Sequence, residues 1–312
     1  MACDDGGRQL KPEATGRPWE LVVQVDRSAW QGELGDTLRA VLEGSTPLLP
    51  QHEPMFRLSV IHQPLSQYKL FRSRLLIALD SQTLEPQLAK AVDLVARPQM
   101  EVKVTAPDAA AAARFIGHNR QLITDLFVDH ELRTEAARLR HRYSRMVADS
   151  VSRQFGHTVC VPEDMRASKT AQDFFWAGTN LLDKDLNYVL YAYDWDRQPL
   201  ELEAFVAKRD SVMRTNIPGS RADQWMETSR MNDSTATPLA IARARIYNKE
   251  RVLEVHGLWD MRGGALGGPF VAQARIDSTH GRVLVNEGFI YSPHSPKRAL
   301  LRQMQAALTT FE

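Results

Sequence analysis

Cysteine is nearly missing from this sequence of 312 residues, which contains only Cys3 and Cys160. Two cysteines so far apart, with no CxxC pair, exclude a disulfide framework and a cysteine-rich zinc site. Long apolar runs are missing as well, since none approaches the roughly 20 residues that a membrane-spanning helix needs. We therefore expect no transmembrane helix in the chain.

Local motifs of catalysis and cofactor binding are also absent. The sequence has no Gly-x-Ser-x-Gly elbow, no HExxH pair and no glycine-rich turn that leads into a helix. The histidines lie at spacings that do not place two ligands on one helical turn. We therefore expect no bound metal and no cofactor. The formal net charge of +1 gives no support to a nucleic-acid partner.

What is present suits two globular domains, because 43% of the residues are apolar and 25% are charged. Helical and strand patterns occur in blocks, and short turns such as 248–250 and 278–281 join apolar stretches into hairpins. This pattern predicts an α+β fold with two domains, each a mostly antiparallel sheet with flanking helices. The expected division is a tether over 1–18, a first domain over 19–156 and a second domain over 157–312.

The amino terminus reads Met1-Ala2-Cys3 and continues to Trp19 through a mostly polar stretch that contains Asp4, Asp5, Gly6, Gly7, Pro12, Gly16 and Pro18. Small residues before a cysteine are typical of the end of a lipoprotein signal, and the polar stretch suits a tether. We therefore expect lipidation at Cys3 and a membrane-anchored protein of the cell envelope. A cytosolic protein with an incidental cysteine is the alternative. Cys160, inside a short apolar run, is expected to be a buried small side chain.

Several stretches resemble one family. They are Trp30-Gln-Gly-Glu-Leu-Gly-Asp36, Thr105-Ala-Pro-Asp108, Ala207-Lys-Arg-Asp-Ser211, Ile217-Pro-Gly219, Gly257-Leu-Trp259, Gly267-Gly-Pro-Phe-Val271, Gly288-Phe-Ile-Tyr-Ser-Pro293 and Lys297-Arg298. The chain resembles uncharacterised Gram-negative envelope lipoproteins that are grouped as a domain of unknown function. The resemblance implies an anchored lipoprotein and no particular activity. The second half also resembles the PsbP/Mog1-like fold in the order of its elements, which by itself carries no function.

The loop from Gly263 to Pro269 is the most conspicuous candidate for a binding site. A proline and a strand follow its glycines, so the pattern favours a flexible connection between strands over a phosphate loop. The alternative is a ligand loop, in which Arg262 would bind an anion and Trp259 would offer a stacking ring beside the open backbone of Gly267 and Gly268.

A second candidate is the stripe of Tyr191, Tyr193 and Trp195, which alternate along one face of a strand. Such rings could line a pocket for an apolar or carbohydrate ligand, although they are more often part of a core.

Glu254 and His256 share strand parity, so they could form an acid–base pair, although exposed polar alternation is the simpler explanation and the one we expect. The sequence therefore predicts an envelope lipoprotein that binds a small ligand or an envelope protein without catalysis. The alternative is an envelope hydrolase with a site around Glu254, His256, Arg262 and the loop Gly263 to Gly268.

Overall fold

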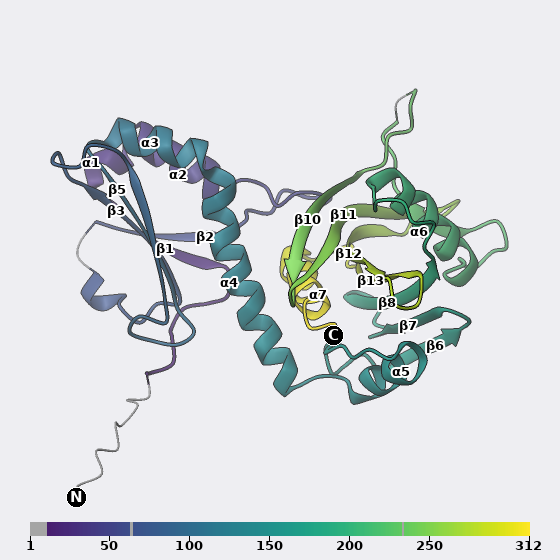
Figure 1. Cartoon of the computed structure of the whole chain (residues 1–312). Coiled ribbons are helices and arrows are strands. Elements are labelled where there is room, and N and C mark those ends of the chain that lie inside the picture. The colour runs from purple at the N-terminus through teal and green to yellow at the C-terminus, as the bar shows by residue number, and fades with distance from the viewer. Residues whose placement is uncertain (1–10, 63–64, 233) are drawn as a thin grey trace, which may run out of the picture. The chain divides into compact units, whose positions relative to one another are not determined.

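The computed structural model describes residues 11–62, 65–232 and 234–312, and the chain divides into two compact units (Figure 1). Unit 1 contains the chain up to Ser45 together with Pro54–Glu131, and unit 2 contains Thr46–Glu53 together with Leu132–Glu312. Cys3 and most of the expected tether lie outside the described residues. Among the described residues, no helix is long and apolar enough to cross a bilayer.

Unit 1 alternates strands and helices around one five-stranded sheet. Its elements are β1 (Glu20–Gln24), α1 (Arg27–Trp30), α2 (Glu33–Leu42), β2 (Arg57–Ile61), the short 3-10 helix η1 (Leu65–Gln67), β3 (Ser73–Leu79), β4 (Gln87–Val92), β5 (Met100–Ala106), α3 (Ala109–His118) and the first part of α4 (Arg120–His141). The Asp108 side chain accepts a hydrogen bond from the Ala111 amide at 2.7 Å and so caps the start of α3.

The first sheet has the order β2-β1-β3-β5-β4, and its strands are mostly parallel. Strand β1 runs parallel to β2 and β3, and β3 runs parallel to β5; β4 alone is antiparallel to its neighbour β5. The expectation of a mostly antiparallel first sheet was therefore wrong. The physical reason is the connection through α1 and α2, which returns the chain to the start of the sheet, as a parallel neighbour requires.

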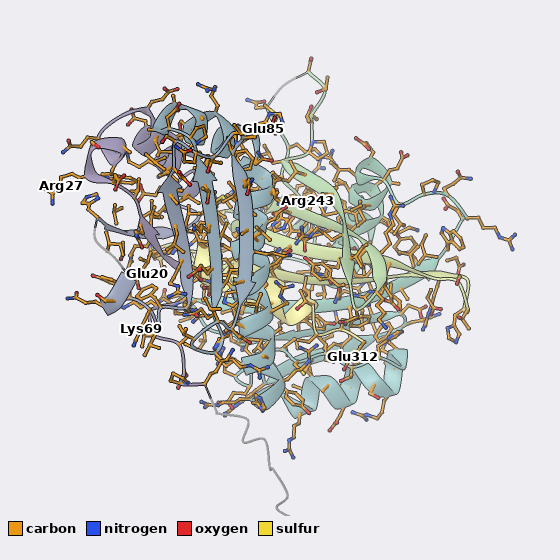
Figure 2. All side chains as sticks on the ribbon, turned by 60° about the vertical axis from the view of Figure 1, so that its left-hand side comes forward. Glu20, Arg27, Lys69, Glu85, Arg243 and Glu312 are labelled. Atoms are coloured by element: carbon orange, nitrogen blue, oxygen red, sulfur yellow. The ribbon has the colours of Figure 1, made fainter. Side chains whose placement is uncertain are left out.

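One face of this sheet is apolar, and the other carries both polar and apolar side chains. Val102 and Val104 of β5 are buried beneath α3, whereas Lys103 between them is exposed. On this second face, Oε1 of Glu20, a residue labelled in Figure 2, accepts a hydrogen bond from the Ser59 hydroxyl at 3.0 Å. Strand β3 is a continuous apolar run after Arg74, which suits its position in the middle of the sheet.

Unit 2 contains the rest of α4 and one large antiparallel sheet. Its further elements are α5 (Arg145–Phe155), β6 (Ala167–Ala171), β7 (Phe174–Gly178), β8 (Asp185–Asp194), α6 (Leu202–Asn216), β9 (Trp225–Thr228), β10 (Ala240–Tyr247), β11 (Glu250–Arg262), β12 (Gly267–Asp277), β13 (Arg282–Tyr291) and α7 (Arg298–Leu308). The strand order is β10-β11-β12-β13-β8-β7-β6, and β9 pairs with the end of β11. Both expected hairpins and the two-domain α+β class are confirmed.

The large sheet of unit 2 is covered on both faces, so successive residues of its strands enter two different layers. Helix α6 contributes Phe205, Val206 and Met213 to an apolar core on one face, together with Phe270 of β12. Helix α7 packs on β12 and β13 from the other face. There the layer includes buried polar residues, such as Gln273. Both faces of the sheet are therefore shielded from water.

A buried ion pair lies in the apolar core beneath α6. The guanidinium of Arg209 donates to both carboxylate oxygens of Glu287, with Nη2–Oε1 at 2.6 Å and Nε–Oε2 at 2.9 Å. Its Nη1 donates to the Thr228 hydroxyl at 3.1 Å, and the guanidinium lies 3.9 Å from the centre of the Phe270 ring. Burial opposes the charge on Arg209, but Glu287 outweighs that effect and raises the pKa of Arg209. The pair therefore joins α6 to β13 through a fixed, bidentate contact.

We expect removal of one member of this pair to destabilise the protein strongly. Arg209→Met leaves the Glu287 carboxylate buried without its cation, which costs about 3–5 kcal/mol of unfolding free energy. The double variant Arg209→Met with Glu287→Leu should recover most of that loss, because no charge then remains buried. Urea denaturation followed by tryptophan fluorescence measures both. A loss below about 1 kcal/mol in the single variant would contradict this account.

Candidate functional site

The glycine-rich segment between β11 and β12 forms a short hairpin. Strand β11 continues to Arg262 and β12 begins at Gly267, so only 263–266 connect them. The Gly263 carbonyl accepts hydrogen bonds from Arg221 Nη2 at 3.0 Å and from Gln224 Nε2 at 2.6 Å. The connection is therefore shorter and better anchored than the sequence indicated.

Close packing explains two of the glycines. A Cβ atom on Gly268 would lie 2.0 Å from the Ile290 carbonyl oxygen, and one on Gly267 would lie 2.9 Å from the Trp259 carbonyl oxygen. Both glycines belong to β12 and face the neighbouring backbone at these short distances. Their small size is therefore a requirement of the sheet.

An open pocket of about 440 Å³ lies beside this hairpin and contains three of the predicted site residues. Its lining combines the hairpin with the segment that precedes α7 and with part of the segment 46–53. The lining residues are Pro50, Gln51, Ser229, Leu258, Trp259, Asp260, Gly264, Ala265, Leu266, Gly267, Gly268, Pro293 and Lys297. We call this concave surface the hairpin pocket.

Lys297 gives the hairpin pocket its most unusual property. Lys297 is only 3% exposed. Its Nζ donates to the Ser295 carbonyl oxygen at 3.2 Å and to Gln51 Oε1 at 3.3 Å. Both acceptors are neutral, and among the described residues no carboxylate forms an ion pair with this ammonium group. Buried lysines are normally paired with an opposite charge. Lys297 is therefore a desolvated cation at the wall of an open pocket.

The position of Lys297 depends on a contact between distant parts of the chain. The backbone N–H groups of Lys297 and Arg298 donate to the two carboxylate oxygens of Glu53, at 2.6 Å and 3.0 Å. These N–H groups lie at the start of α7, where a helix has no internal acceptors to offer them. Glu53 thereby caps α7, and the same segment brings Gln51 to the ammonium group of Lys297.

Arg262 and Trp259, which the sequence suggested as an anion-binding pair, have other roles in the structure. Arg262 is exposed, with Nη1 3.7 Å from Glu227 Oε2 and its guanidinium 5.0 Å from the centre of the Trp225 ring. Trp259 is buried in the apolar core, 5.6 Å from the Phe289 ring, and its Nε1 donates to the Ile290 carbonyl oxygen. Its ring therefore has little free surface for stacking, and Lys297 is the cation that lines the pocket.

The aromatic stripe of β8 lies in the apolar core of unit 2. Tyr191 is buried there, and Tyr193 and Trp195 pack partly buried against the same cluster. The rings of Tyr191 and Tyr193 are stacked with their centres 6.4 Å apart. Burial, followed by the nearby charge of Asp196, raises the pKa of Tyr193 to about 12. The three aromatic side chains therefore belong to the core of unit 2, one of the two positions that their alternation along the strand suggested.

Glu254 and His256 are paired, but they are buried rather than exposed. His256 Nε2 lies 3.2 Å from Glu254 Oε1, which also accepts from Gln305 Nε2 at 3.2 Å. The Tyr247 hydroxyl donates to Glu254 Oε2 at 2.7 Å. The expectation of exposed polar alternation was therefore wrong, because α7 covers this face. Burial disfavours ionisation of Glu254, but His256 and Tyr247 outweigh it and lower its pKa to about 2.

The structure does not gather the residues of the alternative hydrolase site. Glu254 and Arg262 are separated by eight residues of one strand, which at about 3.3 Å per residue places them roughly 26 Å apart. Both oxygens of Glu254 are engaged by neighbours. Within the described part of the chain, no three histidine, cysteine, aspartate or glutamate side chains come together as a metal site.

We predict an acid-dependent contribution of Glu254 to stability. Its folded pKa lies below the ordinary value of 4.5, so the stabilisation is complete above about pH 4.5 and is lost as the pH falls towards 2. Glu254→Gln should remove about 3 kcal/mol at pH 7 and flatten the stability profile in that acidic range. Urea denaturation at several pH values measures this, with Glu85→Gln, an exposed glutamate, as control. Equal profiles for the two variants would refute the assignment.

Comparisons with known proteins give families of unknown function and a weak structural likeness. A family profile described as "Domain of unknown function (DUF8532)" matches residues 14–140. Two solved structures, the Saccharomyces cerevisiae Ran-binding protein Mog1p and a mutant of protein Mog1, are similar at 10% identity with a TM-score of 0.33. The similarity covers 51% and 50% of this chain and 91% and 89% of theirs. No curated protein matches the chain. A second profile, described as "Domain of unknown function (DUF4837)", matches residues 144–310, which is more than half of the chain, and the chain therefore belongs to that family.

Proposed function

We propose that this chain is the body of an envelope lipoprotein that binds a ligand with an anionic group in the hairpin pocket and performs no catalysis. The observation that carries the proposal is the burial of Lys297 beside an open pocket without a carboxylate partner. The Ala2-Cys3 sequence and the polar stretch that follows it support the anchor.

An anionic ligand would complete the surroundings of Lys297. An ammonium group has three donors, and two of them are directed to the Ser295 and Gln51 oxygens. A carboxylate or phosphate oxygen in the pocket would accept the third and supply the missing negative charge. Such a contact is stronger in a site that excludes water than on an open surface.

A binding role also suits the neighbourhood of the pocket. Its other walls are mostly backbone and small or apolar side chains, including the hairpin residues Gly264 to Gly268. Sites of this kind typically combine an apolar lining with a few fixed polar groups. No histidine, cysteine or glutamate is among the described lining residues of this pocket. Its charged lining residues are Lys297 and Asp260.

The alternative function, an envelope hydrolase, is supported by the Glu254–His256 pair at 3.2 Å. A carboxylate that orients a histidine is a recurring element of general-base catalysis. Here the pair is covered by α7, and Glu254 is further engaged by Tyr247 and Gln305. The binding function therefore has the better geometric support.

We expect the native protein to carry a lipid on Cys3. Mass spectrometry of the protein extracted from membranes should show a diacylglyceryl adduct at that residue. Cys3→Ser should release the protein into the soluble fraction, because one cysteine supplies the whole anchor in this proposal. An unmodified Cys3 in the native protein would disprove the anchor without bearing on the pocket.

We expect Lys297 to make the protein sensitive to small anions. At matched ionic strength, phosphate or acetate at ten times its dissociation constant should stabilise the wild type by about 1.4 kcal/mol relative to chloride. Lys297→Met should abolish this stabilisation and keep the folded state, since a buried unpaired charge is removed. Thermal unfolding measures the effect.

The control for this experiment is Lys249→Met, which removes an exposed lysine from the same unit. It should retain the full response to phosphate and acetate. A response that is absent from the wild type, or that persists in Lys297→Met, would disprove the anion site.

A further inference from the structure

Strands β11 and β12 separate at one end of the large sheet and leave a notch between them. Their pairing ends at Leu253 opposite Ala274, although β11 begins at Glu250 and β12 continues to Asp277. The outer neighbours remain paired, because β10 follows β11 to Glu250 and β13 follows β12 to Asp277. The notch is therefore a gap between the ends of β11 and β12, each of which stays hydrogen-bonded to its outer neighbour.

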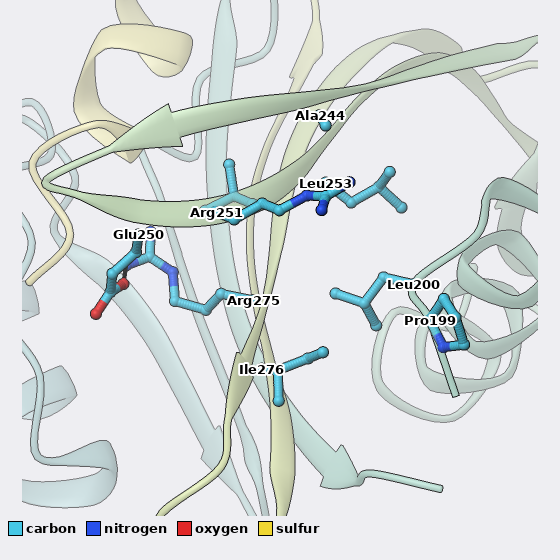
Figure 3. Close-up of a pocket in the computed structure, with 9 residues that line it drawn as sticks. Pro199, Leu200, Ala244, Glu250, Arg251, Leu253, Arg275 and Ile276 are labelled. Atoms are coloured by element: carbon cyan, nitrogen blue, oxygen red, sulfur yellow. Dashed lines mark hydrogen bonds and ion pairs between the residues drawn. The ribbon is translucent and has the colours of Figure 1, made fainter. Parts of the chain in front are cut away.

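A pocket of about 460 Å³ occupies this notch (Figure 3). Figure 3 shows Leu253 of β11, Ile276 of β12 and Leu200, which precedes α6, arranged around the same space. Leu200 and Leu253 also pack against the apolar core beneath α6. The full lining is Pro199, Leu200, Ala244, Glu250, Arg251, Val252, Leu253, Arg275 and Ile276. The notch therefore opens the edge of that core to solvent.

Apolar surface continues at the rim of the notch. Ile276 is 38% exposed, and Ile246 of β10 is 74% exposed. Ile246 is the register partner of Arg251, and cross-strand partners of an antiparallel pair lie on the same face of the sheet. Large exposed aliphatic side chains that cluster at a concavity are typical of surfaces that are covered in use.

The charges around the notch leave one cation unmatched. Glu250 Oε2 accepts from Arg275 Nη1 at 2.9 Å, and the Arg275 guanidinium also stacks 4.5 Å from the centre of the Phe311 ring. Arg251 lies two residues before Leu253, so both side chains project to the same face of β11. Within the described parts of the chain, the Arg251 side chain forms no hydrogen bond or ion pair. Its guanidinium is therefore available at the mouth of an apolar pocket.

From this arrangement we infer that the notch binds an aliphatic carboxylate. The hydrocarbon chain lies against Leu200, Leu253 and Ile276, and the carboxylate accepts a bidentate contact from Arg251. The volume falls within the range of about 300–1,000 Å³ that small-molecule sites occupy. Charge complementarity selects the acid, because the Glu250–Arg275 pair is neutral and Arg251 supplies the remaining charge. This site is separate from the hairpin pocket and does not depend on the function proposed above.

Isothermal titration calorimetry of the full chain with octanoate, octanol and acetate tests the inference. Octanoate should bind to the notch, octanol should bind there about tenfold more weakly because it lacks the charge, and acetate should bind only at Lys297 of the hairpin pocket because it lacks the chain. Arg251→Gln should weaken octanoate about tenfold and leave octanol unchanged. Arg57→Gln, which removes an exposed arginine of unit 1, is the matched control and should leave both affinities unchanged.

Two further variants make the result decisive. Ile276→Trp, a partly exposed position, should fill the notch and abolish binding of octanoate and octanol while circular dichroism shows an unchanged fold. Lys297→Met removes the anion site of the hairpin pocket and should leave the octanoate binding that depends on Arg251 unchanged, which separates the two sites. Absence of octanoate binding to the wild type would overturn the inference, as would equal affinities of Arg251→Gln and the wild type for octanoate.

Discussion

The carboxylate of Glu53 holds the start of α7, and much of unit 2 depends on that contact. It receives the backbone N–H groups of Lys297 and Arg298, which the helix itself could not satisfy. Helix α7 in turn covers one face of the large sheet and keeps Glu254 and His256 out of water. The same segment supplies Gln51 to the Lys297 ammonium group. A cap from distant sequence thus determines both a buried polar layer and the wall of the hairpin pocket.

Buried charges are stabilised differently on the two covered faces of this sheet. Beneath α6, Arg209 and Glu287 neutralise each other by a bidentate contact inside an apolar cluster. Beneath α7, His256 and Tyr247 lower the pKa of Glu254 and so favour its charged form, and Gln305 donates a further hydrogen bond to the carboxylate. Strongly shifted pKa values often indicate catalytic sites, but ion-pair networks that serve structure produce them as well. In this protein both networks join a helix to the sheet, whereas the open pockets lie elsewhere.

Local sequence signals predicted the hairpins and helices of unit 2, and they failed where distant residues decide the structure. Asn248 and Lys249 both adopt positive φ angles, so the turn between β10 and β11 could be recognised from its residues. Strands β4 and β6 have no buried residue, and β9 is only four residues long, so none of the three gave a clear strand signal. The parallel order of the first sheet depends on crossovers that a one-dimensional pattern does not specify. Trp259, Gly267 and Gly268, which the sequence suggested as ligand-binding residues, line one pocket, but nothing local indicated the burial of Lys297.

The position of residues 46–53 has a consequence for how the gene product can be divided. They occur in the chain between two parts of unit 1, yet they belong to unit 2. The predicted boundary near Gly156 falls at the left-handed end of α5, and the units themselves divide within α4, between Glu131 and Leu132. A fragment cut at either point would lack Glu53 and leave the first amides of α7 without an acceptor. The two units are thus discontinuous in sequence, and no single cleavage site yields a second unit with all of its parts.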